Sequence, residues 1–187
     1  MLVDNEAARA GVVRAVLERL GCRVVKQVAS TLDLAKLVAK HTPDVIIIDT
    51  ESPSRDTLEH LCMVSRDQPR PVVMFTHDDD SEKIRAAIRA GVSAYIVDRP
   101  DAGRLKSVID AAIASFEEYH ALRAELGDAH AKLADRKVIE RAKGLLMKQR
   151  GQSEEEAFQS LRKLAMDRHI KLADMARQLI SAAELLG

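Results

Sequence analysis

The sequence has few aromatic residues and lacks the apolar segments typical of membrane and secreted proteins. Among its 187 residues there is no Trp, and aromatic residues make up 3% of the chain, so its cores must be built mainly from aliphatic side chains. No apolar run is long enough to cross a membrane, and the chain does not open with a basic head followed by an apolar segment. We therefore expect a cytoplasmic protein with no membrane partner.

Signs of catalysis and of metal ligation by thiols are also absent. The two cysteines, Cys22 and Cys62, have neither metal-ligand spacing nor the number needed for a disulfide framework, so two reduced thiols are expected. The sequence contains no Gly-rich phosphate loop, no nucleophile with a matched base, and no thiol with a His beside it. The chain is not expected to be an enzyme.

The formal net charge is zero, but the charge is unevenly distributed. Residues 136–187 hold eleven Lys/Arg against seven Asp/Glu, and residues 1–135 hold eighteen against twenty-two. A basic C-terminal module on an acidic body points weakly toward nucleic acid as a partner.

All five prolines lie in the first hundred residues, where short apolar runs alternate with helical patterns. This alternation predicts parallel strands joined by right-handed helical crossovers, that is, a five-stranded doubly wound α/β domain over residues 1–115. The expected strands are 2–3, 23–29, 45–48, 72–75 and 94–97, and the expected helices are 12–20, 32–40, 58–65 and 81–90.

Beyond Pro100 the sequence is continuously helical. In residues 116–135, apolar residues recur at alternating spacings of three and four, which predicts a coiled-coil linker and a homodimer. The alternative is a single amphipathic helix that packs on its own body. The apolar positions are Tyr119, Leu122, Leu126, Ala129 and Leu133.

Residues 136–187 predict an all-α module, a bundle of three helices. The first helix should end at Gly151, and Ser153 with Glu156 forms a capping box that opens the second. The third carries an apolar face from Leu172 to Ala183.

Polar groups follow four of the expected strands, at Asp4, Asp49, Thr76 and the pair Asp98-Arg99. Because the carboxyl ends of parallel strands meet at one edge of the sheet, these groups should converge there. Carboxylates at such an edge suit a hard cation such as Mg²⁺, and a carboxylate beside a metal can accept a phosphoryl group.

The first 115 residues resemble a response-regulator receiver domain through "LVDNE", "IIIDTESPSRD", "VVMFTH" and "AGVSAYIVDRP". The resemblance implies that Asp49 is the phosphoacceptor and that Thr76 and Tyr95 are the switch residues. It also implies that Mg²⁺ would be held by Asp4, Asp49 and the backbone carbonyl of Glu51. No cofactor is required, and Mg²⁺ is possible at this acidic site.

Two departures weaken this implied site. The acid pair of the family reads Asp4-Asn5, so one ligand loses its charge, although Glu6 could substitute from the loop. The lysine that the family places after the fifth strand is Asp98, and Arg99 lies one residue late. The interpretation we prefer is a pseudo-receiver that serves as a docking scaffold, and regulated phosphorylation is the alternative.

A basic stripe runs along the first helix of the C-terminal module. Lys137, Arg141 and Lys148 lie opposite its apolar face, and Gly144 lies on the same stripe. A glycine inside a helix costs about 1 kcal/mol relative to Ala, so we expect a partner to approach the backbone there. Further cations follow on the second helix and in the next turn, and Arg162, Arg168 and Lys171 are counted with the stripe.

The pattern "ERAKGLLM…G.SEEEAF..LRKLAM......LADMARQ" resembles an ANTAR domain, an RNA-binding module of transcription antiterminators. The resemblance implies a dimer that binds paired hairpins in a leader transcript, with contacts in the stretch that holds Arg141, Lys143, Gly144 and Lys148. The order of parts resembles nitrate-assimilation antiterminators, which implies a separate nitrate-sensing protein as an inhibitory partner.

Two other function classes stay open from the sequence. A basic helical module after a receiver could belong to a phosphorylation-switched DNA-binding response regulator, but no helix offers Asn, Gln and Arg at successive exposed positions. The third class is an adaptor without a nucleic-acid role, in which the basic helix docks an acidic protein.

Overall fold

The computed structural model describes residues 1–98 and 102–186, and the side chains of these residues except 102, 185 and 186. The chain divides into two compact units, Met1–His120 and Ala121–Gly187. Each unit has its own core, and each is described by itself.

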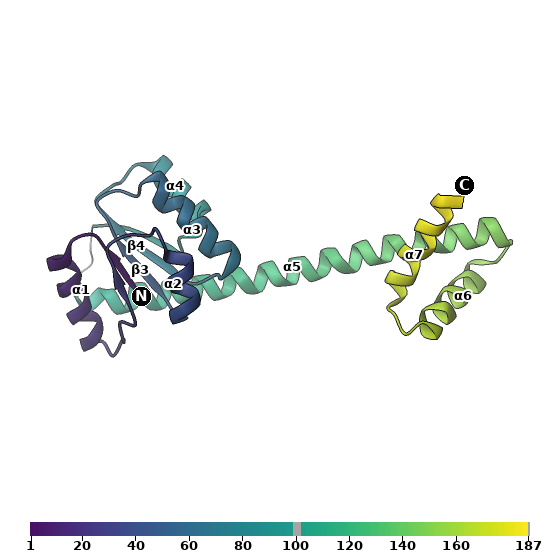
Figure 1. Cartoon of the computed structure of the whole chain (residues 1–187), viewed down its shortest axis with the longest axis horizontal. Helices are drawn as coiled ribbons and strands as arrows, with labels where there is room; N and C mark the ends of the chain where they lie inside the picture. Colours follow the sequence, from purple (N-terminus) through teal and green to yellow (C-terminus); the bar gives the residue numbers. More distant parts are fainter. Residues whose placement is uncertain (99–101, 187) are drawn as a thin grey trace. The chain divides into compact units, whose positions relative to one another are not determined.

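The N-terminal unit is built on five parallel strands in the order β2-β1-β3-β4-β5 (Figure 1). The predicted α/β class with a doubly wound parallel sheet is confirmed. The strands are β1 (Leu2–Asp4), β2 (Gln27–Val28), β3 (Ile46–Asp49), β4 (Val72–Thr76) and β5 (Ala94–Val97). The helices are α1 (Ala7–Arg19), α2 (Leu34–His41), α3 (Arg55–Asp67), α4 (Ser81–Arg89) and the first part of α5 (Ala102–Arg150).

Two apolar layers cover the two faces of this sheet, because neighbouring residues of a strand point to opposite faces. On β3, Ile46 and Ile48 pack against α2, α3 and α4, whereas Ile47 packs against α1 and α5. All three isoleucines are buried. Burial on both faces explains why the strand is an unbroken apolar run.

Most elements lie within one or two residues of their predicted bounds, but three differ more. Helix α1 begins at Ala7, five residues before the predicted start at residue 12. The predicted strand 23–29 is reduced to Gln27–Val28, a half-buried edge strand that pairs with β1 alone. Helix α3 begins three residues earlier than predicted, because the Ser54 side chain caps it by accepting a hydrogen bond from the Thr57 backbone N–H.

The predicted linker and the first helix of the C-terminal module belong to one continuous helix, α5, which runs from Ala102 to Arg150. It ends as predicted at Gly151, whose φ of 66° lies in the left-handed region that favours glycine. The domain boundaries 1–115, 116–135 and 136–187 stay a prediction.

The C-terminal unit contains the end of α5 together with α6 (Glu154–Asp167) and α7 (Leu172–Leu186). Its predicted capping box is present: the Ser153 hydroxyl accepts from the Glu156 N–H, and the Glu156 carboxylate accepts from the Ser153 N–H. The buried side chains come from all three helices, among them Ala142, Leu146, Leu161 and Ala176. The predicted bundle is therefore confirmed.

No helix in the described part of the chain combines the length and the apolar character needed to span a membrane.

Candidate functional site

The predicted acidic site lies at the carboxyl ends of β1, β3 and β4. Asp4 and Asp49 are register partners on adjacent strands, and Thr76 ends the next strand. All three residues are buried, with the Asp4 side chain 0% and the Asp49 side chain 6% exposed. The structure thus brings together the groups that the sequence placed at this edge.

A residue that the sequence analysis missed, Arg9, lies between the two carboxylates. Its Nε donates to both oxygens of Asp4 at 3.1 Å, and its Nη2 donates to Asp4 Oδ1 at 2.8 Å. The same Nε lies 3.3 Å from Asp49 Oδ1. These acids raise the pKa of Arg9, chiefly through the Asp4 hydrogen bonds. Because the guanidinium is always charged, it neutralises part of the negative charge that two buried acids would otherwise leave.

A signal for Arg9 exists in the sequence. Arg9 lies in the first turn of α1, which has no acidic residue, and a cation there opposes the positive end of the helix dipole. A cation at this position is favourable when acids outside the helix offset its repulsion from the helix dipole. Asp4, at the end of the preceding strand, is the acid that does so.

Glu51 and Thr76 are joined by a direct hydrogen bond. The Thr76 hydroxyl donates to the Glu51 backbone carbonyl at 2.7 Å, and the His77 N–H donates to the same oxygen at 3.2 Å. The carbonyl that the receiver resemblance assigns to a metal therefore already accepts two hydrogen bonds. A cavity of about 150 Å³ lies beside Asp49, Thr76 and His77, with Arg9 on its wall.

Tyr95 is half-buried, and its hydroxyl donates to the Asp78 backbone carbonyl at 2.9 Å. Burial raises the pKa of its phenol. The Asp78 carboxylate in turn accepts hydrogen bonds from Lys83 and Ser52, both at 2.5 Å. The ammonium of Lys83, followed by the Ser52 hydroxyl, lowers the pKa of Asp78 to about 2. The loop after β4, next to both predicted switch residues, is therefore held by a charged network.

Asp98 Oδ1 lies 2.9 Å from His77 Nδ1 and accepts a hydrogen bond when that nitrogen carries its hydrogen. Its φ of 60° places it in the left-handed region, where Asp is tolerated better than most residues. The Asp98 side chain is exposed, and it is not among the residues that line the cavity beside Asp49. The predicted role of Arg99 falls outside the described residues.

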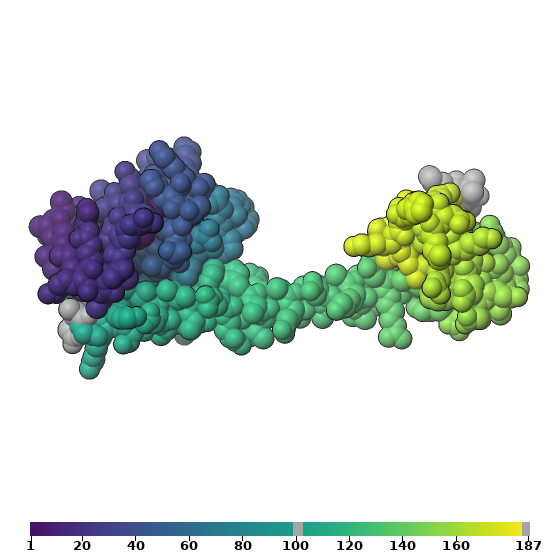
Figure 2. Space-filling view, turned by 90° about the horizontal axis from the view of Figure 1, so that it is seen from below, coloured from purple at the N-terminus to yellow at the C-terminus, as the bar shows by residue number. Residues whose placement is uncertain are grey.

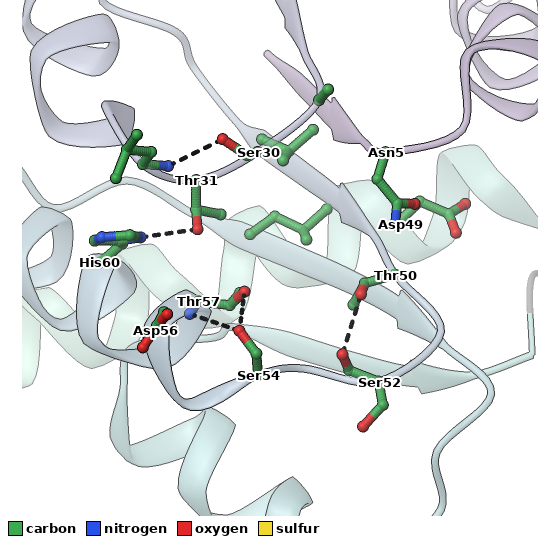
Figure 3. A pocket seen from close by; sticks show the side chains of 14 residues that line it. Asn5, Ser30, Thr31, Asp49, Thr50, Ser52, Ser54, Asp56, Thr57 and His60 are labelled. Atoms are coloured by element: carbon green, nitrogen blue, oxygen red, sulfur yellow. Dashed lines mark hydrogen bonds between the residues drawn. The ribbon is translucent and has the colours of Figure 1, made fainter.

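A second and larger cavity, of about 410 Å³, is also lined by Asp49 (Figure 3). Asn5 and Asp49 form one end of it, and a hydrogen bond of 2.9 Å between Thr31 and His60 Nδ1 marks the other. The remaining polar lining is mostly hydroxyl groups, which belong to Ser30, Thr50, Ser52, Ser54 and Thr57. Asp49 thus lines both cavities.

In the C-terminal unit, four of the predicted RNA-binding positions share an exposed stripe of α5. They are Lys137, Arg141, Gly144 and Lys148. Arg141 forms an exposed ion pair with Glu184 at 2.7 Å, and such surface pairs are weak and easily exchanged for another anion. Apart from the neighbouring residues of its own helix, a methyl group built on Gly144 would meet no described atom within 4 Å. Packing within the chain therefore gives no reason for a glycine at this position.

The structure adds an arginine to this surface. Arg177 of α7 lines a groove of about 450 Å³ together with Lys137 and Arg141, over Val138 and Ile180. Its guanidinium pairs with Asp174 at 2.7 Å and with Asp135. The sequence signal was that Arg177 is the one basic residue of α7, but only the packing of α7 on α5 places it beside the stripe.

Lys143 is not on the stripe. Its side chain is 10% exposed, and its ammonium donates to Glu140 at 2.9 Å and to Glu154 at 2.7 Å. These two acids, Glu154 first, raise the pKa of Lys143. A residue two positions from Arg141 faces nearly the other side of a helix, so Lys143 ties α5 to the start of α6. The structure thus separates Lys143 from the exposed positions with which the sequence analysis grouped it.

The three remaining predicted cations are exposed on α6 and the turn after it. They are Arg162, Arg168 and Lys171. Arg168 donates to the Gln178 side chain at 3.2 Å, and the three do not line the groove between α5 and α7. They extend the basic character of the unit without belonging to the groove.

Comparisons with known families fit this architecture. Residues 1–110 match the response regulator receiver domain and residues 127–180 match the ANTAR domain. The chain belongs to the response-regulator receiver family, and it is a response regulator whose C-terminal module is an ANTAR domain. Both domain families are regulatory, and an ANTAR domain implies RNA binding.

Particular relatives extend this assignment. The chain is 28% identical over 187 residues to the transcriptional regulatory protein PdtaR of Mycobacterium tuberculosis, which covers 100% of the chain and 90% of that relative. It is 40% identical over 68 residues to the nitrate regulatory protein of Klebsiella oxytoca, which covers 36% of the chain and 17% of that protein. Among solved structures, a LuxR-family response regulator from Aurantimonas matches 61% of the chain and 83% of its own, with 28% identity and a TM-score of 0.55.

Proposed function

We propose that this protein is a transcription antiterminator whose ANTAR domain binds paired hairpins in a leader transcript. The observation that carries the proposal is the α5 stripe with its bare glycine, next to the groove that Lys137, Arg141 and Arg177 line. Guanidinium groups suit phosphates and also stack on unpaired bases, and the apolar floor of the groove suits a base face.

Single-stranded loops of RNA fit this surface better than duplex DNA does. Sequence readout of B-form DNA uses a helix that enters the major groove and presents several base-reading side chains. The exposed face of α5 instead combines cations with a stretch of uncovered backbone at Gly144. A surface of this kind favours close approach of a sugar-phosphate backbone over the reading of base edges in a groove.

We further propose that two copies associate through the middle of α5. Tyr119, Leu122, Leu126 and Leu133 are between 52% and 56% exposed, although they are large and apolar. Figure 2 shows the green-teal middle of α5 with its side chains at the surface. Alternating spacings of three and four along one helix are the pattern by which two such helices bury their seams in each other. Because the proposed target contains two hairpins, each copy of the dimer would bind one of them.

The signal is proposed to be nitrate or nitrite, sensed by a separate inhibitory protein. Support comes from the similarity to the nitrate regulatory protein of Klebsiella oxytoca. The state of the acidic site is compatible with such control, because Asp4 and the Glu51 carbonyl are engaged within the chain. Control by a docking partner does not require phosphorylation of Asp49.

The test is binding of the full chain to a two-hairpin leader RNA, to the same RNA with scrambled loops, and to duplex DNA of equal length. Binding should be measured by fluorescence anisotropy between roughly 50 and 200 mM salt, because phosphate contacts weaken steeply over that range. We expect a preference for the intact hairpins that survives the highest salt. Equal weak binding to all three probes would contradict the proposal, and a preference for the duplex would favour a DNA-binding regulator.

A matched pair of variants separates the site from general charge. Arg141→Ala removes an exposed arginine that pairs with a glutamate at 2.7 Å, and Arg14→Ala removes an exposed arginine that pairs with Glu18 at 2.8 Å. Both changes lower the net charge by one. Only Arg141→Ala should weaken binding to the hairpins, and an equal effect of both would show that binding follows net charge alone.

A further inference from the structure

The acidic edge of the sheet contains a cation that belongs to the chain. Arg9 donates to both oxygens of Asp4 and lies 3.3 Å from Asp49, and its side chain is 15% exposed. The two carboxylates end adjacent parallel strands in register. Two buried acids at neighbouring positions repel each other unless a positive charge lies between them. The receiver resemblance implies a divalent cation in that role.

The oxygens that would bind such a cation are engaged by other groups. Asp4 accepts three hydrogen bonds from Arg9 and one from the Glu6 N–H. The Asn5 side-chain oxygen accepts from Arg9 Nη2 at 2.9 Å. The Glu51 carbonyl accepts from Thr76 and His77. Mg²⁺ needs several free oxygens in near-octahedral geometry, so the residues present do not fit this ion.

Electrostatics lead to the same result. A guanidinium at this distance from the acids would repel a dication that shared them, because both groups are positive and the two carboxylates are buried. Glu6 does not replace the charge that Asn5 removes from the acid pair, because its carboxylate forms an ion pair with Arg9 Nη1 at 3.1 Å. Among the described residues, no group of three or more His, Cys, Asp or Glu side chains is placed to hold a metal ion.

We propose that Arg9 is a built-in replacement for the divalent cation, and that it keeps the acidic site closed to metal. The receiver domain then holds one arrangement of β1, β3 and α1 without a bound ion. Asp49 stays beside a fixed positive charge, and the cation that the fold normally exchanges with solvent is here part of the polypeptide. This inference concerns the N-terminal unit and does not depend on the RNA target.

The experiment is a titration of the full-length chain with Mn²⁺, in which free ion is measured by electron paramagnetic resonance, and with Mg²⁺, in which thermal unfolding is measured. The wild-type chain should bind no Mn²⁺ at the site, and Mg²⁺ should not shift its unfolding temperature. Arg9→Ala should unfold at a lower temperature in the absence of metal. It should gain Mn²⁺ affinity by roughly tenfold or more, and Mg²⁺ should restore part of its unfolding temperature.

Arg14→Ala is the matched control, because Arg14 lies on the same helix and is exposed, with its ion pair to exposed Glu18. It should leave metal binding unchanged. Mn²⁺ binding by the wild-type chain that is lost in Asp49→Asn would overturn the proposal, and this measurement holds even if Arg9→Ala does not fold. A folded Arg9→Ala that binds no more Mn²⁺ than wild type would also overturn it, because Arg9 would then not be what excludes the ion.

Discussion

Replacement of Gly144 by alanine separates the stability of the ANTAR domain from its function. Gly144 lies inside α5 with an ordinary helical backbone, since it is not among the glycines with positive φ. Apart from the neighbouring residues of α5 itself, an added methyl group would meet no described atom within 4 Å. Alanine should therefore stabilise the helix by about 0.5–1 kcal/mol, through the lower conformational freedom of the unfolded chain.

The thermal effect follows from the size of the folding unit. For a domain of 60–100 residues, 1 kcal/mol corresponds to about 4–8 °C in the unfolding temperature. We therefore expect the transition of the C-terminal unit to rise by about 2–8 °C in Gly144→Ala. Differential scanning calorimetry on the full chain measures this change.

RNA binding should change in the opposite direction. If the RNA backbone lies against the bare helix at Gly144, a methyl group separates the two surfaces, and hairpin affinity should fall by roughly tenfold or more, or about 1.4 kcal/mol. Fluorescence anisotropy with the two-hairpin RNA provides the measurement. A more stable protein with weaker RNA binding is the expected combination.

Two other glycines provide controls. Gly11 in α1 and Gly127 in α5 are also helical, and an added methyl group would meet nothing within 4 Å at either position. Alanine at each should stabilise its own helix without weakening the RNA complex. Gly144→Ala could raise the unfolding temperature as the two control variants do and still bind the hairpins with full affinity. In that case no partner approaches the α5 backbone at Gly144, and our explanation of this glycine is refuted.

Four further outcomes follow from the same structure. Arg177→Ala should weaken hairpin binding and reduce the salt slope by about 1, as expected for the loss of one phosphate contact, and an unchanged slope in anisotropy titrations would remove Arg177 from the interface. Leu126→Lys should convert a dimer to a monomer in sedimentation experiments, and a dimer that persists would place the contact elsewhere. Asp49→Asn should leave antitermination in cells nearly unchanged, and loss of activity there would revive a phosphorylation switch. The pKa of Asp78 is lowered from 3.8 to about 2, so ionised Asp78 stabilises the fold above the unfolded value, and this stability is lost as pH falls toward 2. The stability difference between wild type and Asp78→Asn should therefore shrink below about pH 4, which acid titrations followed by circular dichroism measure.

Much of this architecture follows from local patterns in the sequence. The apolar run at 45–48 predicts a strand buried on both faces, and β3 is buried on both faces. Ser153 and Glu156 predict a helix start because their hydrogen bonds are local, and the capping box is present. Asp4 and Asp49 converge because the ends of parallel strands share an edge. Each of these features depends on residues close in sequence or on a general rule of strand connection.

The roles of individual side chains required tertiary structure. Lys143 and Arg141 are two residues apart in one basic stretch, yet α6 packs against only one of their faces and makes Lys143 a buried ion-pair partner. Arg177 joins the groove because α7 packs beside α5. Arg9 reaches Asp49 because α1 follows β1 over the strand that neighbours β3. The sequence by itself determined which elements form and where their charged ends lie. Only the packing of those elements decided which charges meet, because a long side chain at a fixed sequence position can point to a partner or to solvent.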